Sequence, residues 1–216
     1  DMFGDWRQVY TNITDDQESG IFITADAEPA FNQVQGDANE MNCEKIYSDA
    51  YTQVSTNGGH RYPDVLNAIT DRVERGSLIT NYIGHGGEVG AAEERIITIP
   101  QANAWTNLNR MGLFVTSTCE FTKFDDPSRE SIGELISLNP KGGSIALMTT
   151  TRSVYISINT LVVASLFNHV IERDANFDPL AFGEIMRRIK NSSGTSANRR
   201  CFNLIGDPAL KICLPK

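Results

Sequence analysis

Two residues of this chain, His85 and Cys119, form the pair with the clearest chemical potential. A thiol becomes a strong nucleophile when a nearby base or cation favours its thiolate form, and an imidazole is a common base for this purpose. Both residues follow apolar runs that predict buried strands, at residues 77–83 and 112–118. The pattern therefore predicts acyl transfer through a cysteine nucleophile that a histidine activates.

Three glycines surround the histidine: Gly84, Gly86 and Gly87. Glycines allow positive φ and a close approach of the backbone to a bound group, and they are a poor way to build a packing site. Acyl transfer needs donors aimed at the developing oxyanion, and the backbone N–H groups of Gly86 and Cys119 suit that task. A structural histidine at position 85 and a core thiol at position 119 are the alternatives.

A third candidate is Asp26. Residues 20–26 are a short apolar run that ends in this acid, which predicts a buried first strand with Asp26 at its carboxyl end. In open α/β sheets, sites lie beyond the carboxyl ends of the strands. We therefore expect Asp26 to face His85 and to fix the orientation of the imidazole, as a carboxylate does in catalytic triads.

The remaining sequence predicts the elements that position these residues. Further buried strands are predicted at residues 77–83, 112–118 and 143–150. Helices are predicted at residues 38–47, 64–76, 129–138, 158–173 and 180–190. Residues 192–199 predict a mobile loop, and residues 203–213 a turn between two short strands. Continuous apolar strands that alternate with helices indicate an α/β fold with a mostly parallel sheet sandwiched between helices.

Composition bounds the class of protein. The 216 residues suit one α/β domain over residues 1–216, and the abrupt start at Asp1 predicts a fragment of a longer multidomain protein. The formal net charge of −8 argues against a nucleic-acid partner, which needs clustered cations. The chain lacks a G-x-S-x-G elbow, an H-E-x-x-H motif and a P-loop lysine, which argues against serine-hydrolase, zincin and nucleotide chemistry.

The remaining cysteines and acids give no strong metal signal. Cys43, Cys201 and Cys213 match no zinc or redox spacing and predict free buried thiols, with a Cys201–Cys213 pair as the alternative. We expect no metal centre and no required cofactor. Asp125 and Asp126 offer oxygen ligands to a structural calcium ion, and solvated acids in a turn are the other interpretation.

Three segments resemble the gingipain-type cysteine peptidases, which have a caspase-like fold. They are Asn-Tyr-Ile-Gly-His-Gly-Gly-Glu at residues 81–88, Phe-Val-Thr-Ser-Thr-Cys at 114–119 and Ile-Gly-Asp-Pro-Ala-Leu at 205–210. The resemblance implies a cysteine endopeptidase with His85 as general base and Cys119 as nucleophile. It also places Asp26 where the family has a carboxylate that orients the histidine.

Within the family, residues 119–127 and 142–152 resemble the PorU-type signal peptidases of the type IX secretion system. This resemblance implies an enzyme on the outer-membrane surface of a Gram-negative bacterium, alongside outer-membrane secretion partners. Its substrates are then secreted cargo proteins, from which it removes a C-terminal signal domain. Transfer of the new carboxyl end to anionic lipopolysaccharide is a second outcome that the resemblance implies.

The resemblance suggests two substrate-binding positions and leaves other functions open. Asp37 lies near the position that sets arginine preference in some gingipains, and Glu120 directly follows the nucleophile. A solvated loop acid is the alternative for Asp37. A secreted degradative endopeptidase is the alternative within the family, and a non-catalytic binding pseudoenzyme is the alternative outside catalysis.

Overall fold

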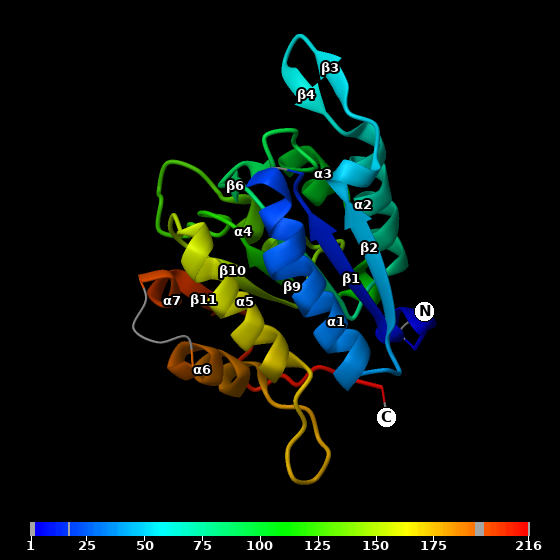
Figure 1. Cartoon of the computed structure of the whole chain (residues 1–216), viewed down its shortest axis with the longest axis vertical. Coiled ribbons are helices and arrows are strands. Elements are labelled where there is room, and N and C mark those ends of the chain that lie inside the picture. The colour runs from blue at the N-terminus through cyan, green and yellow to red at the C-terminus, as the bar shows by residue number, and fades with distance from the viewer. Residues whose placement is uncertain (1–2, 17, 193–196, 216) are drawn as a thin grey trace.

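A six-stranded sheet forms the centre of the computed structural model, which describes residues 3–16, 18–192 and 197–215 (Figure 1). The strand order is β11–β10–β9–β5–β1–β2, and all neighbours are parallel except the antiparallel β10–β11 pair. The strands are β1 (Val9–Thr14), β2 (Asn42–Tyr47), β5 (Ile79–Ile83), β9 (Leu113–Ser117), β10 (Ala146–Thr150) and β11 (Phe202–Ile205). The predicted mostly parallel sheet is confirmed.

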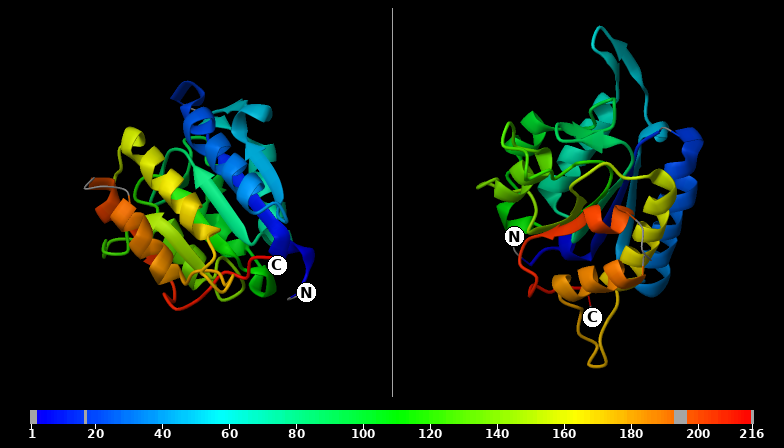
Figure 2. Two further views of the ribbon diagram at one scale, coloured as in Figure 1. Left: turned by 60° about the horizontal axis from the view of Figure 1, so that its bottom comes forward. Right: turned by 90° about the vertical axis from the view of Figure 1, so that its left-hand side faces the viewer.

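Helices cover both faces of this sheet (Figure 2). One face packs against α1 (Glu28–Asp37), α5 (Ile156–Val170) and α6 (Phe182–Ser192). The other packs against α2 (Pro63–Arg75), α3 (Ile99–Ala104) and α4 (Ile132–Leu138). Side chains alternate between the faces along each strand, so that Ile83 joins the first core and Tyr82 the second. Within the described residues, no helix has the length and apolar character needed to cross a bilayer.

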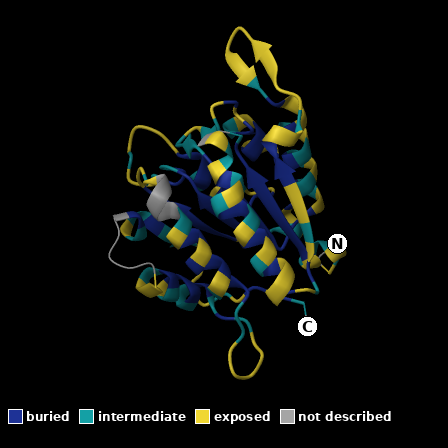
Figure 3. Ribbon diagram, in the orientation of Figure 1, coloured by how far each residue is buried: buried dark blue, intermediate teal, exposed yellow. Residues whose placement is uncertain are grey.

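Small elements surround the sheet. A second, three-stranded sheet contains β6 (Gly86–Gly87), β7 (Gly90–Ala91) and β8 (Ile97–Thr98). A hairpin of β3 (Val54–Thr56) and β4 (Gly59–Arg61) projects from the body and is exposed, whereas the central strands are buried (Figure 3). The short helical turns are η1 (Asp5–Gln8), η2 (Glu18–Gly20), η4 (Ser48–Ala50) and η5 (Leu108–Arg110).

The predicted first strand at residues 20–26 is wrong. Residues Phe22–Ala27 form a π-helix, η3, which runs directly into α1. The first strand is β1 instead, and its polar side chains hide it in the sequence. Thr11 and Asn12 are fully buried because they hydrogen-bond inside the core, for example from the Asn12 Nδ2 to the Ala27 carbonyl at 2.8 Å. A short apolar run does not by itself distinguish a strand from a buried helix.

Four further predictions differ from the structure or lie partly outside the described residues. Residues 38–47 contain the edge strand β2 and not a helix. Polar exposed residues, such as Lys45, occur both on edge strands and on helix surfaces, so the pattern does not separate the two.

The chain has four free cysteines, but Cys43 and Cys201 are only half-buried and Cys213 is exposed. Of the predicted loop at 192–199, residues 193–196 lie outside the described residues, and α7 (Ala197–Cys201) follows. After the turn at residues 206–210, Lys211 forms only an isolated bridge with Ala181, not a second strand.

Asn12 links the sheet to η3, so its removal should weaken the fold. The Asn81 Nδ2 donates to the Asn12 Oδ1 at 2.8 Å, while the Asn12 Nδ2 holds the Ala27 carbonyl. Asn12→Ala leaves these buried groups unpaired, and we expect a loss of roughly 1–3 kcal/mol in the free energy of unfolding by urea denaturation. Asn67→Ala, on the exposed face of α2, is the matched control and should change it by less than about 0.5 kcal/mol. Equal effects of the two substitutions would contradict this account.

Candidate active site

The structure brings His85 and Cys119 to one edge of the sheet. β5 and β9 are parallel neighbours, with Ile83 opposite Ser117, and the two candidate residues each follow two positions later. Because the carboxyl ends of parallel strands meet at the same edge, the two loops leave the sheet side by side. Both side chains are half-buried.

Hydrogen bonds to three residues hold the backbone of His85 in place. Its N–H donates to the Asp15 Oδ2 at 3.1 Å. Its carbonyl accepts from the Tyr82 hydroxyl at 2.5 Å and from the Ala92 N–H at 2.8 Å. The Phe22 ring of η3 meets the imidazole edge to face, with 5.2 Å between ring centroids. These contacts fix the position of the histidine before any substrate binds.

Position 84 requires glycine for this arrangement. A Cβ at Gly84 would lie 2.4 Å from the Asp15 Cβ and 2.6 Å from the Tyr82 hydroxyl oxygen. Because real Cβ atoms do not approach other atoms so closely, only glycine lets the chain pass over these two buried residues. The close packing against Asp15 and Tyr82 thus explains why a glycine precedes His85.

The acid at the end of the first strand is Asp15, not Asp26. Asp15 directly follows β1, and its N–H donates to the Ile83 carbonyl at 3.1 Å. Burial raises the pKa of the Asp15 carboxyl to about 7, against the opposing hydrogen bond from the His85 N–H. Asp26 lies in η3 and is buried against α5, where burial raises its pKa and a hydrogen bond with Thr160 opposes the shift.

A sequence signal for Asp15 exists, although a search for apolar runs passes over it. Residues 9–14, Val-Tyr-Thr-Asn-Ile-Thr, are rich in β-branched and aromatic residues, as strands are, and two acids follow them. The run looks too polar for a buried strand only when each Thr and Asn is assumed to face water.

The loop after Cys119 is held by the segment that follows β10. The Val154 N–H donates to the Cys119 Sγ at 3.4 Å, which fixes the position of the sulfur. The Glu120 N–H donates to the Arg152 carbonyl at 3.2 Å, and the Thr122 N–H to the Thr150 carbonyl at 3.0 Å. Glu120 itself has a φ of 47°, so the chain turns sharply directly after the sulfur-bearing residue.

The histidine loop and the cysteine loop are also joined to each other. The Glu88 carboxylate pairs with Lys123 at 2.7 Å and with Arg129 at 3.3 Å. Gly86 packs onto Thr118, where a Cβ at position 86 would lie 2.7 Å from the Thr118 Oγ1. The ion pairs and this close packing make the two loops one surface.

The Gly86 N–H does not take part in the β6–β7 ladder. Gly86 pairs with Ala91 in the β6–β7 ladder, and the Ala92 N–H donates to the His85 carbonyl. In an antiparallel ladder this makes Gly86–Ala91 a non-hydrogen-bonded pair, so the Gly86 N–H points away from β7. The donor is therefore free of the ladder.

The other candidate residues lie in different places. The Glu120 carboxylate is partly exposed, 3.7 Å from the Lys123 Nζ. Asp37 ends α1, at the end of the helix away from η3, where it accepts a hydrogen bond from Gln33 (Figure 1). The structure therefore does not bring Asp37 to the His85–Cys119 edge. Asp125 forms an ion pair with Arg152, and Asp126 accepts from the Ser128 N–H and hydroxyl.

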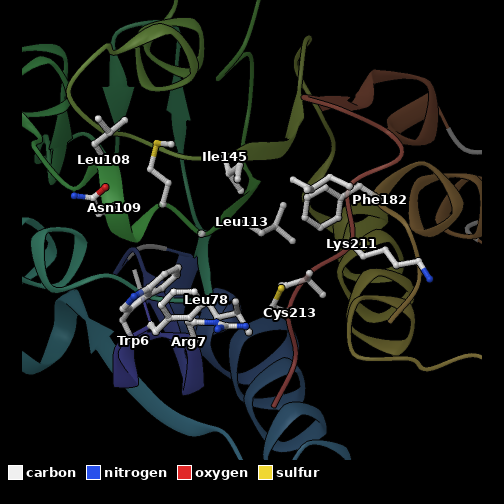
Figure 4. Close-up of a pocket in the computed structure, with 15 residues that line it drawn as sticks. Trp6, Arg7, Leu78, Leu108, Asn109, Leu113, Ile145, Phe182, Lys211 and Cys213 are labelled. Carbon is white, nitrogen blue, oxygen red and sulfur yellow. The ribbon is translucent and has the colours of Figure 1, made fainter. Parts of the chain in front are cut away.

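An apolar cavity of about 360 Å³ lies at the opposite edge of the sheet (Figure 4). Leu78, Leu113 and Ile145, which line it, stand at or just before the amino ends of β5, β9 and β10. Trp6 and Cys213, from the two ends of the chain, close it. This cavity is therefore separate from the candidate active site.

Comparison with models of known protein families gives a match over nearly the whole chain. The family model described as peptidase family C25 matches residues 1–213. A search of the curated proteins gives no match.

Solved structures with the same fold include gingipain R (RgpB), an Arg-specific cysteine proteinase, with a TM-score of 0.77 and 16% identity over 99% of this chain and 49% of that chain. A complex of the pro- and mature domains of RgpB from Porphyromonas gingivalis gives a TM-score of 0.74 and 15% identity over 99% of this chain and 50% of that chain. A further protease structure gives 0.73 and 14%, with 99% and 50% covered. The chain thus spans about half the length of these solved proteins, and at such identities the likeness shows the fold.

Gly86 and Gly87 provide a matched pair of tests for the contact between the two loops. Gly86→Ala places a Cβ against the Thr118 Oγ1 and the Gly90 carbonyl, and we expect a loss of about 1–3 kcal/mol in the free energy of unfolding. Gly87→Ala should change it by less than about 0.5 kcal/mol, because in the described chain no residue beyond its two neighbours in sequence lies within 4 Å of that Cβ. Adding Thr118→Ala to Gly86→Ala should restore part of the loss. No recovery in the double variant would contradict the proposed contact.

Proposed function

Because this chain belongs to peptidase family C25, we propose that it cleaves peptide bonds through a thioester on Cys119, with His85 as the general base. The single observation that supports this most is the β5–β9 register, which puts the two residues at matched positions on neighbouring loops. The roles follow from the chemistry of a thiol beside an imidazole.

The reaction divides into two steps. His85 takes the proton from the Cys119 thiol, and the sulfur attacks the scissile carbonyl carbon. The resulting oxyanion accepts hydrogen bonds from the backbone N–H groups of Gly86 and Cys119. The tetrahedral intermediate then collapses: the C–N bond breaks, His85 gives its proton to the leaving amine, and a thioester remains. Water or another amine attacks the thioester next, and the thiol is released.

Asp15 is the residue that we propose as the support for His85, in place of Asp26. It accepts from the His85 N–H and so acts on the position of the histidine through the backbone. The Phe22 ring, edge to face with the imidazole, limits its rotation. Neither residue needs to touch the substrate. The chemistry requires no cofactor, because the thiol, the imidazole and the backbone donors supply the nucleophile, the base and the oxyanion site.

We also propose that the substrates are secreted cargo proteins of the type IX secretion system, from which this domain removes a C-terminal signal domain. The segments that resemble the PorU-type branch, residues 119–127 and 142–152, support this. They contact each other beside the sulfur, through the Asp125–Arg152 ion pair and the Glu120–Arg152 backbone bond. The two similar segments therefore lie against each other next to Cys119.

The same proposal implies a cell-surface location at the outer membrane of a Gram-negative bacterium, with outer-membrane secretion proteins as partners. Lipopolysaccharide is then the acceptor of the cargo's new carboxyl end. A degradative endopeptidase is the second candidate, because one similar structure is that of an Arg-specific cysteine proteinase. The two functions differ in how many sites are cut and in what attacks the thioester.

Incubation of cargo with the full-length enzyme and a small amine, such as hydroxylamine or a glycine ester, tests this proposal. We expect amine adducts at one defined carboxyl terminus, detected by mass spectrometry, because a signal peptidase with transfer ability presents its thioester to an acceptor. Cys119→Ala should lower cleavage at least about a thousandfold and serves as the control. Many internal cuts with free carboxylates would favour the degradative enzyme instead. No cleavage by the intact enzyme would favour the non-catalytic alternative.

A further inference from the structure

The segment between β10 and α5, residues 151–155, contacts the sulfur of Cys119 through its backbone. The Val154 N–H donates to the Cys119 Sγ at 3.4 Å. The Val154 carbonyl accepts from the same thiol, with 3.7 Å between the sulfur and the oxygen. A hydrogen bond from an N–H group to sulfur favours the thiolate form, provided that the donor is held in place. The reactivity of Cys119 therefore depends on the groups that fix this segment.

Asn198 fixes the residue that follows Val154. The Tyr155 N–H donates to the Asn198 Oδ1 at 3.1 Å, and the Asn198 Nδ2 donates to the Tyr155 carbonyl at 2.8 Å. One amide side chain thus pairs with both backbone groups of one residue, as a residue of a neighbouring antiparallel strand would. Tyr155 directly precedes the first residue of α5, so this pair fixes the point at which the segment ends.

The Asn198 side chain is buried, although most of the segment that it holds lies at the surface. Asn198 is only 2% exposed and lies in the short helix α7, beside the start of α5 (Figure 1). A buried amide is costly unless its donor and acceptor groups are paired, and the two bonds to Tyr155 meet that need. The pairing therefore holds a surface segment from inside the fold.

The other end of the segment is tied to the same helix. The Thr151 N–H donates to the carbonyl of Cys201, the last residue of α7, at 2.8 Å. The Arg152 carbonyl accepts from the Glu120 N–H at 3.2 Å, on the side of the cysteine loop. α7 thus holds both ends of the segment, and the cysteine loop is bonded to the residues between them.

We propose that Asn198 is a positioning residue for the nucleophile. Its amide fixes Tyr155 and thereby places the Val154 N–H against the Cys119 sulfur. Asn198 acts through the backbone of residues 154–155 and does not need to contact a substrate. The effect on peptide cleavage rests on the proposed function, whereas the effect on the reactivity of the thiol does not.

Asn107 provides a matched control at the opposite edge of the sheet. Its Nδ2 donates to the Gly143 carbonyl at 3.0 Å, and its Oδ1 accepts from the Gly143 N–H at 2.8 Å. Asn107 is 6% exposed, and Gly143 lies before the amino end of β10. Removal of either asparagine side chain therefore breaks the same two kinds of hydrogen bond, but only Asn198 is connected to the sulfur.

Alkylation by iodoacetamide at neutral pH, followed by peptide mass spectrometry of the full-length protein, tests the proposal. We expect Asn198→Ala to slow the alkylation of Cys119 at least about threefold relative to Cys213, because the sulfur loses a fixed N–H donor. Asn107→Ala should lower Tm by a similar few degrees and leave the Cys119 rate unchanged. Asn198→Asp keeps the shape but loses the donor to the Tyr155 carbonyl. It should also slow Cys119, and it is the second variant if Asn198→Ala folds poorly.

Peptide cleavage gives a second readout. In Asn198→Ala, kcat should fall at least about tenfold while KM changes by less than about twofold, because a displaced nucleophile affects the chemical step and not substrate binding. Unsubstituted Cys119 rates in both Asn198 variants would overturn the proposal, as would an equal slowing of Cys119 by Asn107→Ala. An unsubstituted protein that cleaves no peptide, with the alkylation pattern as expected, would count against the proposed function and leave the role of Asn198 standing.

Discussion

The parallel pairing of β5 with β9 is the constraint on which the candidate site depends. With Ile83 opposite Ser117, the loops that carry His85 and Cys119 leave the sheet together. Strand pairing fixes this register because a shift by one residue would turn every side chain to the other face, and both strands are buried on both faces. The chemistry therefore depends on packing in the two cores as much as on the reactive residues.

Polar groups next to the two loops fix the positions of His85 and Cys119. Asp15 and Tyr82 hold the backbone of His85, and the Val154 N–H holds the sulfur of Cys119. These groups include the buried Asp15 carboxyl, whose pKa burial raises to about 7.

The sequence identifies the two strands that lead to His85 and Cys119 and misses β1, which leads to neither. β5 and β9 are followed by Gly-His-Gly and by cysteine, so their ends are visible without a structure, although β5 also buries Thr80 and Asn81. β1 is equally buried, but its Thr11 and Asn12 satisfy their polar groups inside the core, and a pattern of apolar residues cannot show that. The apolar pattern therefore places the first strand at residues 20–26, ending at Asp26, whereas the first strand is β1 and Asp15 follows it. Burial through hydrogen bonds depends on partners distant in the sequence, such as Ser77 and Ala27.

The pairing of His85 with Cys119 is tested most directly by the rate at which iodoacetamide alkylates individual cysteines, followed by peptide mass spectrometry. Accessibility alone predicts that the exposed Cys213 reacts faster than the half-buried Cys119. A thiol activated by a neighbouring imidazole reverses this order, and we expect Cys119 to react at least about tenfold faster at neutral pH. His85→Ala should remove most of that advantage and leave Cys213 unchanged. Equal Cys119 rates with and without His85 would contradict the account.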